Sequence, residues 1–241
     1  MINKELEIIY KKEHFLAINK SPGLLVHPSS HTNKKEVTLA DLVVEDFPEV
    51  SLVGDKPGIR PGIVHRLDRF TSGVMIVART QEFFDYFKKL LKIRDIKKTY
   101  WALVWGKIED EGVIDTPIGL INGTTRRSVV RPEKKNFKLK MVKDAYTTYK
   151  PLKNYKKDGK DFTLLELYPK TGRTHQLRVH LLSIHHQLVA DGVYGKRDNP
   201  FGLERFFLHA KAIEFTGIDG VRLKIEAPLT EDLQNVIDQL E

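Results

Sequence analysis

The stretch that most constrains this chain runs from residue 62 to residue 78, where a dense polar cluster leads into an apolar run. Its last part, residues 74–78, is short, apolar and rich in β-branched side chains, and it follows a glycine, so it predicts a buried strand. The polar cluster, residues 65–72, therefore lies in the connection that enters this strand. Connections held by a rigid sheet often carry binding or catalytic side chains, and we expect a functional site here.

Asp68 is the one carboxylate of this cluster, and it lies close to Arg66 and Arg69 in the sequence. Neighbouring cations favour the ionised carboxylate, and a fixed, ionised carboxylate is one of the nucleophiles of covalent catalysis. The residues also have a simpler interpretation. Asp followed by Thr, Ser and Gly is a common turn sequence in which the Asp side chain caps backbone amides. Spacing alone favours the turn.

The sequence His-Arg-Leu-Asp at 65–68, followed by Thr-Ser-Gly at 71–73, resembles the signature of the RluA-type pseudouridine synthases. These enzymes isomerise uridine to pseudouridine in structured RNA. The resemblance implies that Asp68 is the essential catalytic carboxylate and that Arg66 fills the space that the target uridine leaves in the RNA. The residues of this stretch expected to contact RNA or the base are His65, Arg66 and Thr71.

A second stretch, residues 169–182, predicts a loop that enters a helix. Leu177, Leu181 and Ile184 have helical spacing, and Thr171 or Thr174 is expected near the N-cap. An arginine at the positive end of a helix, as Arg173 would be, is unfavourable unless an anion faces it.

This second stretch closely matches the family's Gly-Arg-Thr-His-Gln motif, whose arginine pairs with the catalytic aspartate. The resemblance therefore implies an ion pair between Arg173 and Asp68, and an apolar wall formed by Leu177. The alternating run at 97–106 predicts a strand and matches the family's Lys-x-Tyr-x-Ala-x-Val-x-Gly block, so Tyr100 is expected to stack on the uracil. From the residues alone, a core tyrosine with a satisfied hydroxyl is the alternative for Tyr100.

The turn at 19–28 also resembles a family motif, in which a lysine directly precedes a proline. Here Ser21 separates Lys20 from Pro22, so the role of Lys20 is not assigned.

The other segments predict an alternation of short strands and helices. They are a hairpin at 6–18, a helix within 36–47, a loop at 49–61, a Thr80-capped helix with Phe83, Phe84 and Phe87 in the core, a strand and turn at 112–119, an exposed hairpin or loop at 122–143, strands at 145–149 and 162–167 joined by a connection at 153–160, and a helix after Thr230. The resemblance covers nearly the whole chain. It implies an α/β (α+β) class, with a mixed, mainly antiparallel sheet flanked by helices in a single catalytic domain over 1–241. No N-terminal S4 domain is expected.

Composition favours a polyanionic partner. The formal net charge is +8, and basic residues are concentrated at 88–98, 126–143 and 150–160. The chain has no cysteine, which fits a reducing cytoplasm and excludes disulfides. The spacing of His175, His180, His185 and His186 does not favour a metal site. Together with the resemblance, this predicts a cytoplasmic, monomeric enzyme that acts on ribosomal or transfer RNA without cofactor or metal.

Two alternatives remain open at this point. The first is a non-catalytic RNA-binding or assembly factor on the same fold, although Asp68, Tyr100 and Arg173 are all present. The second is a nuclease using His65 and Asp68, which lacks a second acidic cluster to hold magnesium.

Overall fold

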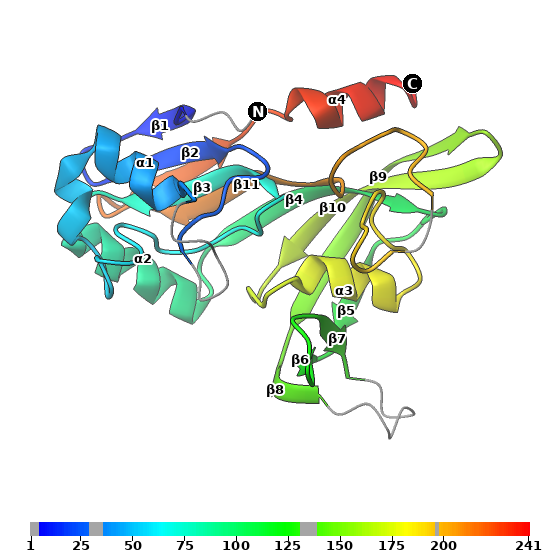
Figure 1. Cartoon of the computed structure of the whole chain (residues 1–241), viewed down its shortest axis with the longest axis horizontal. Helices are drawn as coiled ribbons and strands as arrows, with labels where there is room; N and C mark the ends of the chain where they lie inside the picture. The colour runs from blue at the N-terminus through cyan, green and yellow to red at the C-terminus, as the bar shows by residue number, and fades with distance from the viewer. Residues whose placement is uncertain (1–4, 29–35, 131–138, 196–197) are drawn as a thin grey trace. The chain divides into compact units, whose positions relative to one another are not determined.

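The computed structural model describes residues 5–28, 36–130, 139–195 and 198–241 (Figure 1). The chain divides into two compact units, each described by itself. Unit 1 comprises Met1–Lys98 and His209–Thr230, and unit 2 comprises Thr99–Leu208 and Glu231–Glu241. Part of the basic stretch predicted at 126–143, residues 131–138, lies outside the described residues. In the described residues, no helix combines the length and apolar character needed to cross a membrane.

Unit 1 contains a mixed sheet. Its order is β1 (Ile8–Lys11), β2 (Phe15–Lys20), β3 (Ser72–Ala78) and β11 (Leu208–Thr216), with β12 (Arg222–Glu226) paired to β11. Neighbouring strands are antiparallel except for β3 and β11, which are parallel. Every residue of β3 is buried, as the apolar run at 74–78 predicts.

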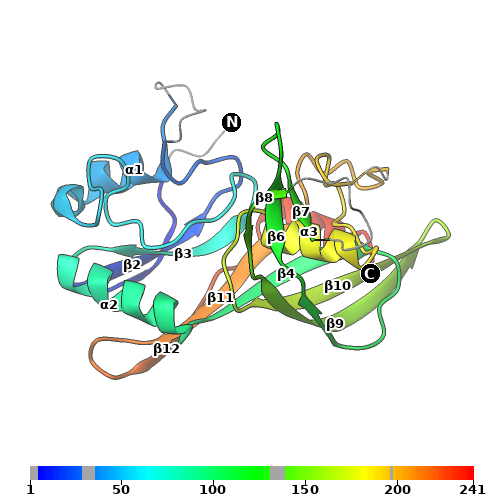
Figure 2. The ribbon, with the colours of Figure 1, turned by 90° about the horizontal axis from the view of Figure 1, so that it is seen from below.

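The helices of unit 1 are α1 (Leu39–Asp46) and α2 (Gln81–Ile93), and both begin at a threonine whose side chain accepts a backbone N–H. The predicted Thr80 cap is confirmed. Figures 1 and 2 show α2 running beside β3. The predicted phenylalanines of α2 are in the core, where the Phe83 ring stacks on Phe15 with 4.6 Å between centroids. The loop expected at 49–61 differs in one respect, because it includes most of a 3-10 helix, η1 (Pro48–Leu52).

Unit 2 contains an antiparallel sheet in the order β4 (Lys97–Trp105), β10 (Lys160–Pro169), β9 (Tyr146–Lys157) and β5 (Gly112–Asp115); the first two residues of β4 belong to unit 1. The helices α3 (Gln176–Ser183) and α4 (Glu231–Asp238) lie on opposite sides of this sheet (Figures 1 and 2). A second sheet has the order β7 (Arg127–Val129), β6 (Ile118–Ile121) and β8 (Leu139–Lys143). The predicted mixed, mainly antiparallel architecture is confirmed.

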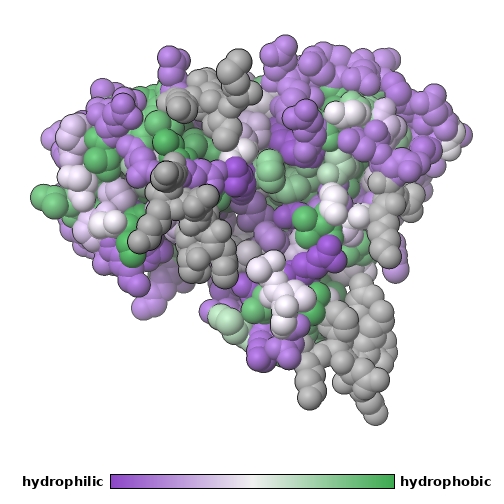
Figure 3. Space-filling view, viewed as in Figure 1, coloured by the Kyte–Doolittle hydropathy of each residue, from purple (hydrophilic) through white to green (hydrophobic). Residues whose placement is uncertain are grey.

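The hairpin of β9 and β10 is longer than the sequence predicted. The predicted connection at 153–160 is wrong, because the strands continue to Lys157 and from Lys160 and only Asp158 and Gly159 form the turn. Both turn residues have positive φ, 50° and 71°, which is the backbone that a two-residue hairpin turn requires. Hydrophilic side chains cover this hairpin (Figure 3).

Candidate active site

Asp68 begins a tight turn that leads into β3. Its carbonyl accepts a hydrogen bond from the Thr71 N–H at 3.1 Å, so Arg69 and Phe70 are the corner residues. Thr71 and Ser72 are buried behind the turn, whereas Asp68 is half-buried and Arg66 is exposed. In the described part of unit 1, the Asp68 carboxylate has no hydrogen-bond or ion-pair partner. The turn interpretation of this sequence is therefore correct, and it leaves the carboxylate available for another role.

His65 fixes the segment that precedes Asp68. The Gly62 carbonyl accepts a hydrogen bond from the Ala78 N–H of β3 at 2.9 Å. Further along the same segment, the His65 Nε2 accepts one from the Ile76 N–H of β3 at 3.0 Å. The imidazole thus takes the place of a strand carbonyl along β3. Its ring stacks on Phe87 with 6.0 Å between centroids. Burial, and to a lesser extent the Lys98 ammonium, lowers the pKa of His65 to about 3, so the ring is neutral at physiological pH.

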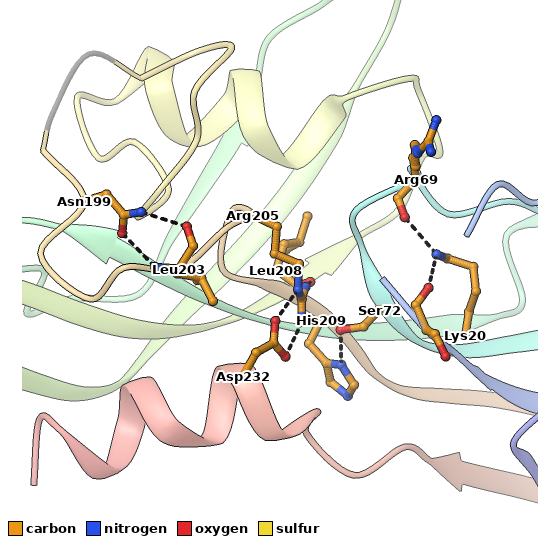
Figure 4. A network of polar contacts seen from close by, with 10 residues as sticks. Lys20, Arg69, Ser72, Asn199, Leu203, Arg205, Leu208, His209 and Asp232 are labelled. Atoms are coloured by element: carbon orange, nitrogen blue, oxygen red, sulfur yellow. Dashed lines mark hydrogen bonds and ion pairs between the residues drawn. The ribbon is translucent and has the colours of Figure 1, made fainter. Parts of the chain in front are cut away.

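Lys20 holds the turn from the other side. Its side chain is buried, and its ammonium donates to the carbonyls of Ser21 (2.7 Å), Leu24 (3.0 Å) and Arg69 (3.0 Å). The Arg69 carbonyl also accepts the Gly23 N–H at 2.9 Å, and Figure 4 shows the Lys20 contact. A buried ammonium surrounded by backbone carbonyls is a satisfied group that fixes those carbonyls. Lys20 therefore joins the turn at 21–24 to the turn that carries Asp68.

The start of β3 is fixed by a buried polar pair and a close backbone approach. The Ser72 hydroxyl donates to His209 Nδ1 at 2.9 Å (Figure 4). His209 Nε2 donates to the Ala227 carbonyl at 3.3 Å. Gly73 has φ +112°, and a Cβ there would lie 2.3 Å from the Ala210 carbonyl oxygen. Only glycine fits this position, because a side chain would separate β3 from β11.

In unit 2 the structure brings Tyr100 and Leu177 to one apolar cluster. Leu177, on α3, is 6% exposed and packs with Ala102, Leu165 and Leu167. Tyr100, on β4, is partly buried against the same cluster. Both residues thus lie where the sheet of unit 2 meets α3.

The loop before α3 is organised by Gln176, whose role the sequence did not indicate. Its Oε1 accepts from the Arg173 N–H at 3.0 Å and from the Thr171 hydroxyl at 2.7 Å, and its Nε2 donates to the Thr147 hydroxyl at 3.0 Å. The Arg173 side chain donates through Nε to the Asp144 carbonyl at 2.9 Å. The N-cap residue is His175, with φ 57°, which directly follows the predicted Thr174.

A buried ion pair lies one turn further along α3. Arg178 binds Asp191 through two hydrogen bonds of 2.8 and 2.7 Å, and the two side chains are 5% and 1% exposed. Asp191 also accepts the N–H of Tyr194 at 3.1 Å. The Tyr194 hydroxyl is hydrogen-bonded to His175 Nδ1 at 2.7 Å and accepts from the Arg127 N–H at 2.9 Å, so this network connects α3 to β7.

The rings of His175, His180 and His186 each have their own hydrogen-bond partner. His180 is buried and contacts the Thr147 hydroxyl at 2.9 Å and the Thr116 carbonyl at 3.0 Å. Burial lowers the pKa of His180. Among the described residues, no three His, Asp or Glu side chains are grouped so that they could hold a metal ion.

Comparison with known proteins identifies the family. The family model described as RNA pseudouridylate synthase matches residues 14–183, a range that includes both the Asp68 turn and the Arg173 loop. The chain belongs to the RNA pseudouridylate synthase family.

Curated relatives match this chain over nearly its full length. It is 37% identical over 244 residues to "Ribosomal large subunit pseudouridine synthase D" of Nitrosomonas europaea, with 98% of this chain and 65% of the relative covered. The protein of the same name from Pseudomonas aeruginosa is also 37% identical, with 95% of this chain and 69% of the relative covered. An uncharacterised RNA pseudouridine synthase from Chloroflexus aurantiacus is 36% identical, with 92% and 66% covered. The chain spans about two thirds of the length of these relatives.

Two solved structures have the same fold as this chain. Human RNA Pseudouridylate Synthase Domain Containing 1 matches with a TM-score of 0.74 at 24% identity, covering 98% of this chain and 95% of that one. Human RNA Pseudouridylate Synthase Domain Containing 4 also has a TM-score of 0.74, at 24% identity.

The predicted site residues of this chain fall into two groups. Unit 1 carries His65, Arg66, Asp68 and Thr71 within one short segment, and unit 2 carries Tyr100, Arg173 and Leu177 around α3. The predicted Arg173–Asp68 ion pair would join the units, and it stays a prediction. The RNA contacts of His65 and Thr71 also stay predictions, but the observed contacts of both residues stabilise the turn and β3.

Proposed function

We propose that this protein is an RNA pseudouridine synthase with Asp68 as its catalytic carboxylate. The observation that carries the proposal is the position of Asp68 on a turn held by a buried lysine and by backbone hydrogen bonds, with its own carboxylate unpaired in the described part of unit 1. Membership of the pseudouridylate synthase family supports the same reaction. A fixed carboxylate suits covalent catalysis because its geometry costs no reorganisation during the reaction.

The reaction is an isomerisation, so it requires no oxidant, reductant or metal. The bond between N1 of uracil and C1′ of the ribose breaks, the base turns, and C5 forms a bond to C1′. The proton released from C5 is balanced by the proton gained at N1. The uridine must leave its stack to reach the carboxylate, at a cost of roughly a few kcal/mol.

Each predicted site residue has a role in this proposal. Arg66 is exposed beside Asp68 and would occupy the gap that the uridine leaves in the RNA. Tyr100 would stack on the uracil, next to the apolar wall formed by Leu177. Arg173 would pair with Asp68 and keep it ionised. We assign positioning roles to His65 and Thr71, since one accepts a β3 amide and the other is buried behind the turn.

The proposed substrate is a uridine in structured RNA. Two of the relatives are named as acting on the large ribosomal subunit, so large-subunit ribosomal RNA is the first candidate, with transfer RNA as the second. Basic residues at 88–98 and 150–160 would contribute phosphate attraction that does not depend on sequence. We further propose that the protein is a monomer and needs no cofactor. We place it in the cytoplasm, because its RNA substrates are found there and a chain without cysteine fits that reducing compartment.

The test is pseudouridine mapping of total RNA from cells with and without the gene, complemented by wild type, by Asp68→Asn or by Asp95→Asn. Asp95 is a half-exposed acid elsewhere in unit 1, paired with Arg222 at 3.9 Å, and serves as the matched control. We expect a site that disappears in the deletion and returns with wild type and Asp95→Asn. Asp68→Asn should reduce the rate by at least about a thousandfold. Unchanged RNA in the deletion strain, or full rescue by Asp68→Asn, would contradict the proposal.

A further inference from the structure

Phe70 differs from every other aromatic side chain that the structure describes. It is 45% exposed, whereas the other described Phe, Tyr and Trp residues are buried or half-buried. Exposing a phenylalanine to water costs free energy in proportion to the apolar area that stays unburied. Isolated apolar residues on a surface are ordinary, so exposure by itself indicates nothing. The surroundings of Phe70 carry the argument.

The position of Phe70 is rigid. It is the second corner of the turn closed by the Asp68 carbonyl and the Thr71 N–H, and it lies two residues from the proposed catalytic carboxylate. The preceding carbonyl, that of Arg69, is held by Lys20 at 3.0 Å, and Thr71 on its other side is 2% exposed. An aromatic ring on a fixed backbone loses little conformational freedom when a ligand binds.

Phe70 lies beside two arginines in the sequence, one of them paired with an acid, and two residues after Asp68. The Arg69 guanidinium carbon lies 5.8 Å from the centre of the Phe70 ring, and this guanidinium is held by Glu36 at 2.6 Å. Arg66 is exposed four residues earlier. A flat apolar ring flanked by arginines matches a nucleotide, because the ring stacks on a base while the cations attract the phosphates. A second protein would need a larger apolar patch than one ring provides.

From these contacts we propose that Phe70 is a stacking platform for the RNA base next to the target uridine. This inference rests on the proposed function. When the uridine leaves the stack, its neighbour loses a partner, and the exposed ring offers a replacement without hydrogen-bond readout. Phe70 therefore contributes affinity and holds the strand in register, and it takes no part in the bond changes at the uridine.

The test measures RNA binding and catalysis separately. Binding is measured with the Asp68→Asn protein, which does not turn over, and a short oligouridine that carries 2-aminopurine beside one uridine. Adding Phe70→Ala should weaken binding roughly tenfold and lose the quenching of 2-aminopurine, since base stacking on an aromatic side chain has about this effect. Phe70→Trp should keep both, and Phe70→Leu should lose the quenching because it is apolar but not aromatic. Ile59→Ala, which removes an apolar side chain 52% exposed in the same unit, is the matched control and should change neither.

Salt dependence and kinetics sharpen the result. Phe70→Ala should leave the slope of log affinity against log salt unchanged, because it removes no charge and so releases no counterion. With Asp68 intact, Phe70→Ala should raise KM roughly tenfold and keep kcat within about twofold.

The outcomes separate this inference from the proposed function. Equal RNA affinity and equal 2-aminopurine quenching in the Phe70→Ala and parent proteins would overturn the stacking role. Turnover by the wild-type protein would in that case still support the proposed function. If Phe70→Ala instead abolished self-association of the protein and left the RNA affinity unchanged, Phe70 would be a protein contact. That result would also overturn the stacking role. Absence of wild-type turnover on structured RNA would contradict the proposed function. The binding series with the oligouridine would still decide the role of Phe70.

Discussion

The two groups of predicted site residues are stabilised by different kinds of contact. In unit 1 the Asp68 turn is held mainly through backbone groups: Lys20 binds three carbonyls, and His65 accepts a strand N–H. In unit 2 the region around α3 is held through side chains that bind one another, above all Arg178 with Asp191. Contacts to the backbone depend on the path of the chain, whereas side-chain pairs depend on both partners being present. The two regions should therefore respond differently to substitution.

The largest expected effect is at the buried ion pair of unit 2. Arg178→Met leaves the Asp191 carboxylate buried without its cation, so we expect the free energy of unfolding to fall by about 3–5 kcal/mol. Adding Asp191→Asn should recover part of this loss, because it removes the unpaired charge and keeps an oxygen for the Tyr194 N–H. Denaturant unfolding measures both variants.

The control for this prediction is Arg222→Met, which breaks a half-exposed pair in unit 1 with 3.9 Å between the charged groups. We expect no measurable change in stability, as is common for such pairs. Equal losses for Arg178→Met and Arg222→Met would contradict the comparison between the two regions.

A smaller effect is expected at Lys20 in unit 1. Lys20→Met keeps most of the side-chain volume but leaves buried carbonyls without their donor, which should cost roughly 1–3 kcal/mol of unfolding free energy. Because the Arg69 carbonyl belongs to the Asp68 turn, kcat should fall more than KM rises. Kinetics at a temperature well below the unfolding transition measures this. A variant with reduced stability but normal kcat would show that Lys20 does not position the turn.

A further expected effect is the pH dependence of stability. The pKa values of His65 and His180 are lowered by burial, so the unfolded chain takes up protons on these rings at a pH where the folded chain does not. Stability is therefore fully present above about pH 6.5 and falls as the pH is lowered toward 3, by at most about 1.4 kcal/mol per pH unit for each histidine. Denaturant unfolding from pH 7 to pH 5 measures the slope.

The variant His65→Asn should reduce that slope, and substitution of the exposed His185 should not. Above pH 6.5, the activity of the wild-type protein should not depend on the ionisation of His65, since the ring is already neutral. An unchanged slope in His65→Asn would rule out the buried, neutral imidazole.

Several elements could be predicted from local sequence because local physics decides them. The buried strand at 74–78, the Thr80 cap and the phenylalanine face of α2 are examples, since each depends on residues a few positions apart. The length of the β9–β10 hairpin could not be predicted in this way. Its two strands support each other by pairing, and the polar residues from 153 onward resemble a loop when viewed alone.

The contacts that fix the site were the hardest to predict. Lys20 and Arg69 are far apart in the sequence, as are Ser72 and His209, and no local pattern indicates that they meet. His65 has a structural contact that its motif did not indicate, because its Nε2 accepts a strand amide, and its RNA contact stays a prediction. Gln176 had a usable signal, since a polar residue at the start of an apolar helix face often binds the preceding loop.

Gly73 has a consequence for how this sequence can change over time. Because even one added carbon would collide with Ala210, substitutions at residue 73 require a shift of β3 relative to β11 and hence of the Asp68 turn that precedes it. A library randomised over residues 62–78 should therefore return glycine at 73 almost without exception, while exposed positions such as Phe70 vary. A change of the aromatic ring would then alter the affinity for RNA without disturbing the carboxylate beside it.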